Sequence, residues 1–374
     1  MRAFLPLLSL GKESAETGVP GHRVLVLLAS LVVFAAVSCR NIPPSGDGAL
    51  PPGNYYAHFF EVIPGGVVTI SPYGDGKRDT LMVPDGGVRK IVCMSSSYIG
   101  YLEAIGEVGK VCAVSGKGFI SCEDIVSDPE VYDVGYDAEL DYERILSLHP
   151  DVLLTYNVGE VGAPYIQRLR SLGIRVMVLS EHLEENPLSR SEYVRFFGAL
   201  TGKAAEADSA FRKVESNYLA LRKSVDRDAA PVRVLINAPY SDQWYIPGGD
   251  SYMTTLIKDA GGEVLGAREG TAQSSIISLE DAFILSSKAD VWLHPSSCRT
   301  REQIRSLNPM FTKFDIPFIY NNTRRVTPAG GNDFWESGAF RCDLILSDLV
   351  SIISGCTSPE RAVSPSFEYY LEVK

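Results

Sequence analysis

Short apolar runs alternate with amphipathic stretches along most of the chain. In the first half, four runs rich in Val, Ile and Leu end in Ser, Gly or Asn: RKIVCMS (89–95), KVCAVSG (110–116), DVLLTYN (151–157) and IRVMVLS (174–180). Helical spacing of apolar positions marks YIGYLEAIGEV (98–108), LDYERILSLHP (140–150) and APYIQRLRSLG (163–173). This alternation is typical of βα units that build a parallel sheet. We therefore predict a first α/β lobe over residues 61–186, with a β-hairpin at 67–84 around a Gly/Asp turn.

A long helical pattern interrupts the alternation. Between Ser189 and Val225, apolar residues recur every three or four positions, which predicts one long helix, or two helices that meet at Thr201-Gly202, within residues 187–228. After Pro231 the strand-like and helix-like runs resume and predict a second α/β lobe over residues 229–374. The expected fold class is α/β, with two βα lobes, each built on a mainly parallel sheet, joined by a long helix.

The first forty residues have the pattern of a secretion signal. The apolar run at 24–37 (VLVLLASLVVFAAV) is too short for a helix that spans a bilayer, which takes roughly 20 residues. It has the length of a signal-peptide core, and Ala36-Val37-Ser38-Cys39 resembles a bacterial lipobox. We predict a signal peptide at 1–38, then a lipidated Cys39 and a flexible tether at 39–60, which would anchor the protein in the cell envelope facing the periplasm or the outer surface. An ordinary signal peptide with an incidental Cys39 is the alternative.

Composition excludes several classes of protein. The chain of 374 residues has a formal net charge of -11 and 45% hydrophobic residues, so it has ample core and no basic face for nucleic acid. Five scattered histidines without a C-x-x-C or H-x-x-x-H motif predict no metal site and no cofactor. Six cysteines remain after Cys39. Buried free thiols are expected, and Cys93–Cys112 is the pair to test for a disulfide.

Five segments resemble the cobalamin and iron-chelate substrate-binding proteins of ABC importers. They are RKIVCMSSSYIGYLEAIG (89–106), DVGYDAELDYERILSLHPDVLL (133–154), NPLSRSEY (186–193), WYIPGGDSYMTTLIKDAGG (244–262) and GGNDFWESGAFRCDLILSDL (330–349). The resemblance implies two lobes joined by a rigid helix, a monomer, and a ligand that is an iron chelate (siderophore or haem) or a corrinoid such as cobalamin. It also implies delivery to an inner-membrane permease that is driven by an ATPase.

Candidate ligand-binding residues follow the predicted strands, because ligands of open parallel sheets bind beyond the carboxyl ends of the strands. Aromatic faces suit a flat or macrocyclic ligand, and a few polar groups would orient it. The candidates are Tyr98, Lys117 and Tyr156 in the first lobe, and Tyr240, Trp244, Tyr245, Asp333, Phe334, Trp335, Glu336 and Arg341 in the second. The alternative is that these aromatic residues merely cover the core.

Two glutamates are candidates for docking to the permease. In the family an acidic residue on the outer surface of each lobe pairs with arginines of the permease, and the matching positions are Glu160 and Glu280. Surface carboxylates that are simply solvated are the alternative.

Two other classes of function compete with the importer hypothesis. A hydrolase would have to use Asp333 with Glu336, or Asp250 near His294, as an acid and base, yet the chain has no G-x-S-x-G, P-loop or H-E-x-x-H motif. We therefore expect no enzyme activity. The other competitor is a surface or periplasmic scavenger without a permease of its own. The residues leave siderophore, haem and corrinoid open as ligands.

Overall fold

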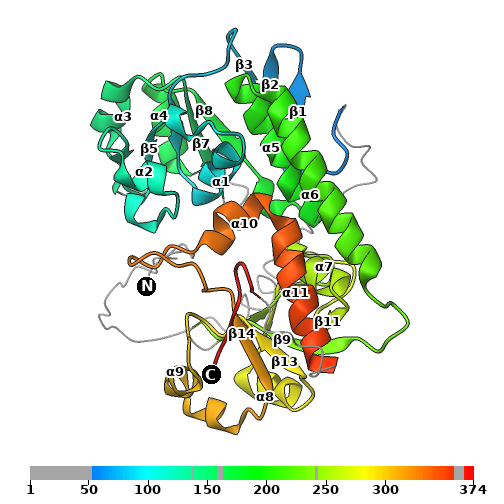
Figure 1. Cartoon of the computed structure of the whole chain (residues 1–374). Helices are drawn as coiled ribbons and strands as arrows, with labels where there is room; N and C mark the ends of the chain where they lie inside the picture. The colour runs from blue at the N-terminus through cyan, green and yellow to red at the C-terminus, as the bar shows by residue number, and fades with distance from the viewer. Residues whose placement is uncertain (1–52, 137–138, 158–162, 241–242, 358–365) are drawn as a thin grey trace, which may run out of the picture. The chain divides into compact units, whose positions relative to one another are not determined.

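Two five-stranded sheets organise the part of the chain that the computed structural model describes, which is residues 53–136, 139–157, 163–240, 243–357 and 366–374. The central strands of both sheets are short, apolar and buried almost throughout, as expected where helices cover both faces. The α/β fold class with two mainly parallel sheets is therefore confirmed (Figure 1). We call the part around each sheet a lobe.

The sheet of the first lobe is wholly parallel, with the strand order β6-β5-β4-β7-β8. Its strands are β4 (Ile91–Cys93), β5 (Val111–Val114), β6 (Tyr132–Asp133), β7 (Val152–Tyr156) and β8 (Val176–Leu179). Its helices are α1 (Ser96–Ala104), α2 (Glu123–Ser127), α3 (Tyr142–Leu148) and α4 (Pro164–Ser171), with the 3₁₀ turns η1 (Val108–Lys110), η2 (Lys117–Phe119) and η4 (Glu181–Leu183). Because the chain winds outward in both directions from β4, the order reverses between β4 and β7.

The sheet of the second lobe has the order β11-β9-β13-β14-β15, in which only β15 is antiparallel. Its strands are β9 (Val232–Ile236), β11 (Gly262–Val264), β13 (Val291–Leu293), β14 (Phe318–Asn321) and β15 (Leu371–Glu372), beside the small pair β10 (Trp244–Ile246) and β12 (Ser275–Ile277). The helices are α7 (Tyr252–Asp259), α8 (Leu279–Ser286), α9 (Arg301–Leu307), α10 (Ser337–Phe340) and α11 (Cys342–Thr357), with the 3₁₀ turns η5 (Pro309–Lys313) and η6 (Asp333–Trp335). The order reverses between β9 and β13.

A three-stranded antiparallel sheet precedes the first lobe. It comprises β1 (Phe60–Ile63), β2 (Gly66–Ile70) and β3 (Arg78–Met82), and the β2–β3 pairing confirms the hairpin expected at 67–84. Phe60 packs against Tyr193 and Phe196, with ring centroids 4.7 and 6.0 Å away. This packing joins the small sheet to the connecting helices.

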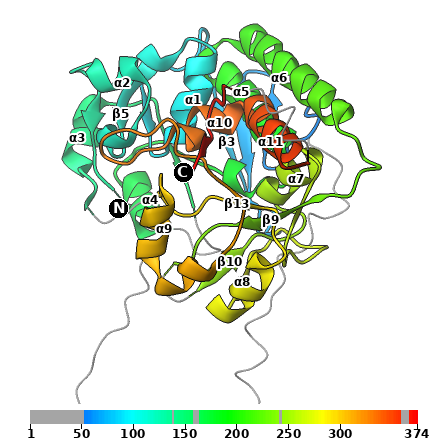
Figure 2. The same cartoon turned by 60° about the horizontal axis from the view of Figure 1, so that its bottom comes forward.

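Two helices, α5 (Pro187–Thr201) and α6 (Ala204–Ser224), join the lobes, so the second of the two sequence alternatives holds. They break at Gly202, whose φ of 81° is left-handed and strained for any residue with a Cβ. The helices lie side by side in both views (Figure 1, Figure 2), and α5 is buried nearly all round. It touches both lobes, because the Tyr101 ring of α1 stacks on Phe197 at 5.1 Å and the Ser191 hydroxyl donates to the Phe340 carbonyl of α10 at 2.7 Å.

The six cysteines of the described part are free thiols, four of them buried, as the sequence predicted. No helix in this part combines the length and apolar character that a membrane span requires.

Candidate functional site

The loops at the two strand-order reversals define where a ligand would sit. In a doubly wound sheet the loops on either side of such a reversal run in opposite directions and leave a crevice beyond the strands. In the first lobe this region holds Ser95 after β4, Ser96 and Ser97 at the start of α1, and Tyr156 at the end of β7. In the second lobe the loops hold Asn237 after β9 and His294 after β13.

The carboxyl-end face of the first lobe is polar. The Ser97 hydroxyl donates to Glu181 Oε1 at 2.9 Å, and Nδ1 of the exposed His182 lies 3.8 Å from Glu181 Oε2. The His182 ring meets Tyr156 edge-on, with centroids 6.0 Å apart. Burial opposes ionisation of Glu181, but His182, Arg190 and Ser97 outweigh it and lower the pKa of the carboxyl below its usual value. A buried carboxylate therefore lies directly behind this face.

Of the three candidates in the first lobe, only half-buried Tyr156 lies among these groups with its side chain accessible. Tyr98 is fully buried in α1 and packs against Phe197 at 5.8 Å, so its ring belongs to the core. The Lys117 ammonium donates to the carbonyls of Asp128 and Val131 at 2.5 and 2.9 Å and holds a loop together. We withdraw Tyr98 and Lys117 as surface contacts for a ligand.

The carboxyl-end face of the second lobe covers an aromatic core. Trp244 is fully buried, its indole Nε1 donates to the Ile236 carbonyl at 2.8 Å, and its ring stacks on Phe314 at 6.2 Å. Trp244 is therefore a core residue, contrary to the expectation of a binding surface. Its neighbours in the chain are more accessible, since Tyr240 is 61% exposed and Tyr245 is half-buried.

His294 is buried and neutral. Its Nε2 lies 2.7 Å from the Tyr370 hydroxyl, and burial lowers the pKa of the imidazole to about 3. The Phe334 ring meets the imidazole edge-on at 5.7 Å. An imidazole held in this way is unsuited to act as an acid and base with Asp250, so the structure disfavours that enzyme hypothesis.

The segment from Asp333 to Arg341 contacts the first lobe and holds the remaining candidates. The Glu336 carboxylate accepts hydrogen bonds from the backbone N–H groups of Ser121 and Cys122 at 2.7 and 2.8 Å, so it connects the two lobes. Burial, with Asp333 and Glu103 nearby, raises the pKa of Glu336 to about 7 although these N–H groups oppose the shift. Glu336 is thus a structural contact.

The rest of this segment divides between core and surface. Asp333 and Phe334 are buried, and the Asp333 carboxylate forms an ion pair with Arg325 at 3.1 Å. The Arg341 guanidinium is half-buried and pairs with Asp343 at 2.8 Å. Trp335 is 39% exposed, which makes it the one tryptophan of the described residues with an accessible ring. Asp333 and Glu336 are therefore occupied by structural partners rather than free to act as a catalytic pair.

Sequence reasoning missed Glu181, His182 and Arg190. The first two follow the strand-like run 174–180, so the rule that selected Tyr98 and Tyr156 applies equally to them. Arg190 gives a weaker signal, since it is a charged residue at a position where α5 is buried on every side.

Of the two expected permease-docking residues, only Glu280 lies in the part of the chain that the structure describes. Glu280 is exposed in the first turn of α8. Glu160 and Cys39 lie outside the described residues.

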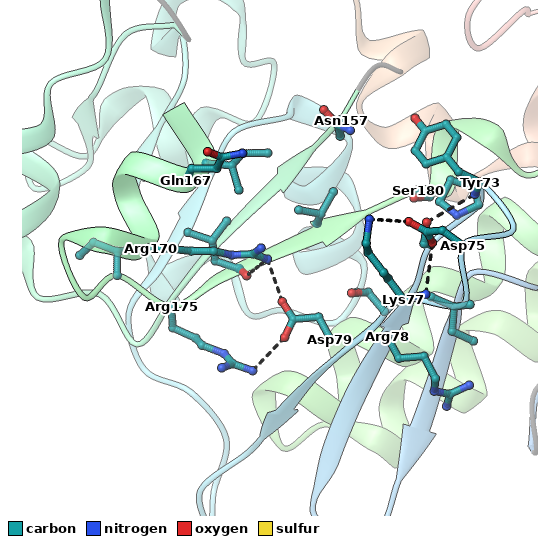
Figure 3. Close-up of a pocket in the computed structure, with 18 of the residues that line it drawn as sticks. Tyr73, Asp75, Lys77, Arg78, Asp79, Asn157, Gln167, Arg170, Arg175 and Ser180 are labelled. Carbon is teal, nitrogen blue, oxygen red and sulfur yellow. Dashed lines mark hydrogen bonds and ion pairs between the residues drawn. The ribbon is translucent and has the colours of Figure 1, made fainter. Parts of the chain in front are cut away.

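A pocket of about 810 Å³ lies between the β2–β3 loop and the edge of the first lobe (Figure 3). Asn157 and Ser180, which follow β7 and β8, connect its lining to the carboxyl-end face. Arg170 and Arg175 both reach Asp79, at 2.9 and 3.2 Å, as Figure 3 shows. Two guanidinium groups therefore share one carboxylate, and the lining as a whole carries more cationic than anionic side chains. No metal-binding group of His, Cys, Asp or Glu occurs in the described part of the chain.

Comparison with known proteins assigns the class. Residues 91–326 match the model of a family described as periplasmic binding protein, and this chain belongs to that family. An uncharacterized lipoprotein of Methanocaldococcus jannaschii is 28% identical over 289 residues, which are 74% of this chain and 67% of that protein.

Solved structures share the fold. A periplasmic haem-binding protein of Pseudomonas aeruginosa superposes with a TM-score of 0.52 at 19% identity, over 77% of this chain and 98% of the other. The periplasmic vitamin B12-binding protein BtuF of Vibrio cholerae superposes with a TM-score of 0.51 at 13% identity, over 72% and 98% of the two chains. The suspected class, two lobes with a helical connection, is confirmed.

Replacing Glu336 by Gln should remove part of the pH dependence of stability. A glutamate in the unfolded chain titrates near pH 4.3, roughly, whereas Glu336 in the folded state does so at about 7. Between these values the folded state holds a proton that the unfolded chain has released, so the contribution of Glu336 to stability is greatest at acidic pH and falls as pH rises through 7. Between pH 5 and 8, the free energy of unfolding should fall by about 1–3 kcal/mol less in Glu336→Gln than in the unaltered protein, as measured by urea unfolding.

The exposed Glu280→Gln is the matched control and should keep the slope of the unaltered protein. An identical slope in Glu336→Gln would contradict the assigned titration of this contact.

Proposed function

We propose that this protein is the substrate-binding lipoprotein of an ABC importer and acts as a monomer without enzyme activity. It captures haem, a corrinoid or a ferric siderophore between the carboxyl-end faces of its two lobes and delivers the ligand to an inner-membrane permease. The observation that carries the proposal is the family match over residues 91–326, which spans both of the strand-order reversals. The haem-binding and vitamin B12-binding names of two proteins with the same fold support this class of ligand.

Accessible aromatic rings provide the ligand surface in this proposal. Three accessible candidates remain after the buried ones are removed: Trp335, Tyr240 and Tyr156. Tyr245 is half-buried and so is only partly accessible. Aromatic faces bury large apolar areas of a macrocycle at a small cost in side-chain entropy. The polar groups around Glu181 would then orient the bound ligand.

Incubation with haem, cobalamin, cobinamide and ferric siderophores, followed by native mass spectrometry, tests the function and identifies the ligand. For the ligand found, Trp335→Ala should weaken binding about 10- to 100-fold, because losing the buried apolar area of one indole costs on the order of 1–3 kcal/mol. Calorimetry measures the affinity.

The contrasting variant is Trp244→Ala, which should lose about 3–5 kcal/mol of stability because it leaves a cavity in the core. Full affinity in Trp335→Ala together with a large loss of stability would return this residue to the core, and binding of none of the probes would refute the proposed ligand class.

Glu280 and Glu160 form the permease-docking pair in this proposal. An exposed carboxylate in the first turn of a helix is free to meet an arginine and to steer a transient complex. The double variant Glu160→Arg with Glu280→Arg should abolish uptake of radiolabelled ligand, since reversal replaces attraction by repulsion, and should leave ligand affinity unchanged. Glu206→Arg on α6, which is also exposed, should transport normally. Normal uptake by the double variant would exclude both glutamates.

Lipidation of Cys39 anchors the protein in this proposal. The lipobox-like sequence supports it, and so does the description of the M. jannaschii relative as a lipoprotein. Cys39→Ala should shift the protein from the membrane fraction to the soluble fraction, or block processing, as followed by immunoblot and by incorporation of labelled lipid. Unchanged lipid incorporation would show that Cys39 is not the modified residue.

A further inference from the structure

Polar atoms without partners gather where α1, α5 and α7 meet. Eight buried side-chain polar atoms of the described residues have no hydrogen-bond partner, and five belong to one neighbourhood: Tyr98 Oη, Glu181 Oε2, Arg190 Nε, Tyr193 Oη and Tyr252 Oη. Electrostatic interactions connect Glu181 with Arg190, Tyr98 and Tyr193. A buried polar group without a partner destabilises the folded state, so native proteins normally supply a partner from water or a bound molecule.

Arg190 is the group for which this cost is highest. The residue is only 8% exposed, and its Nε–H has no acceptor in the described part of the chain. Burial opposes its charge, but Tyr252, Tyr101 and Glu181 raise the pKa of the guanidinium, which therefore stays protonated. A buried cation needs a counter-ion in contact with it.

Glu181 does not serve as that counter-ion at close range. Its Oε1 accepts from Ser97, its Oε2 faces His182 at 3.8 Å, and the carboxylate forms no ion pair with Arg190. The Tyr101 hydroxyl donates to the backbone carbonyl of Arg190 at 2.8 Å, which fixes the helix at this residue. The guanidinium itself packs on an aromatic ring, since its carbon lies 5.1 Å from the centroid of the Tyr252 ring. The Tyr252 hydroxyl, also without a partner, belongs to the same ring.

We propose that Arg190 and the Tyr252 hydroxyl bind an anionic oxygen group of the ligand, a carboxylate or a phosphate. The fork of a guanidinium matches both groups bidentately, and a phenol adds one neutral donor. Because Arg190 belongs to a connecting helix and Tyr252 to the second lobe, this anion contacts two parts of the protein at once. The inference rests on the proposed function and specifies the chemistry that the ligand must carry.

The test begins with inorganic phosphate, which requires no knowledge of the ligand. Phosphate should raise the melting temperature of the unaltered protein above that in sodium chloride of equal ionic strength, because an anion that binds only the folded state stabilises it. In Arg190→Gln this specific increase should vanish. An equal increase in both proteins, or none in either, would overturn the anion site.

Matched probe pairs then distinguish the two sources of the anion. Haem carries carboxylates that haem dimethyl ester lacks, and cobalamin carries a phosphate that cobinamide lacks. Arg190→Gln should weaken binding of the member of one pair that carries the anion about 10- to 100-fold and leave binding of the member that lacks it unchanged, since hydrogen bonds to charged groups contribute about 1.5–3 kcal/mol. Equal losses for both members of a pair would reduce Arg190 to a structural residue.

Tyr252→Phe keeps the ring beside Arg190 and removes only the hydroxyl, so it provides a second test if Arg190→Gln folds poorly. It should weaken binding of the acid probe about 3- to 10-fold, and unchanged affinity would overturn the part assigned to the hydroxyl. If none of the four probes binds the unaltered protein but phosphate stabilises it through Arg190, the anion site is supported, and haem and corrinoids are excluded as the ligand.

Discussion

Buried carboxylates that accept backbone hydrogen bonds hold distant parts of this chain together. Glu192 on α5 accepts from the N–H groups of Tyr55, Tyr56 and Ala57. Glu184 accepts from those of His58 and Phe59, Asp348 from those of Glu368, Tyr369 and Tyr370, and Glu336 from those of Ser121 and Cys122. Each carboxylate thus fixes a segment far away in sequence, and hydrogen bonds to charged groups are stronger than neutral ones. Part of the acidic excess of the chain is therefore structural.

Close backbone contact also restrains the two lobes near Glu336. A Cβ on Gly331 would lie 1.9 Å from the Phe119 carbonyl oxygen, and one on Gly100 would lie 2.3 Å from that of Glu336. With α5 packed on both α1 and α10, the lobes are connected at the helices and again through Glu336. Two connections oppose a wide hinge motion, so ligand entry should change the angle between the lobes only slightly. A largely preformed surface then has to supply the affinity.

Periodicity and composition were sufficient to predict the two lobes, the β2–β3 hairpin and the break near Gly202, because local sequence determines strands, helices and turns. They could not separate core from surface among the aromatic residues. Trp244 begins a strand-like run and Trp335 lies in a loop-like segment, yet Trp244 is covered by Trp292, Phe311 and Phe314, which lie 48 to 70 residues further along the chain. Only the tertiary fold brings those rings together. For a similar reason the loop carbonyls that hold Lys117 could not be identified from the sequence, whereas the partner of Arg341, Asp343, lies only two residues away.

The two carboxyl-end faces differ in a way that bears on the ligand. Behind the face of the second lobe lie aromatic rings and a neutral His294, which favour apolar contact. Beside the first lobe lie Glu181 and Arg190, which favour polar and charged contact. Glu181 also differs from Glu192, Glu184, Asp348 and Glu336, which accept hydrogen bonds from backbone N–H groups, because its Oε2 has no hydrogen-bond partner. The Arg190 guanidinium needs an acceptor whereas Glu181 Oε2 needs a donor, so a molecule that suits both faces is apolar over most of its surface and presents both kinds of polar group at one end.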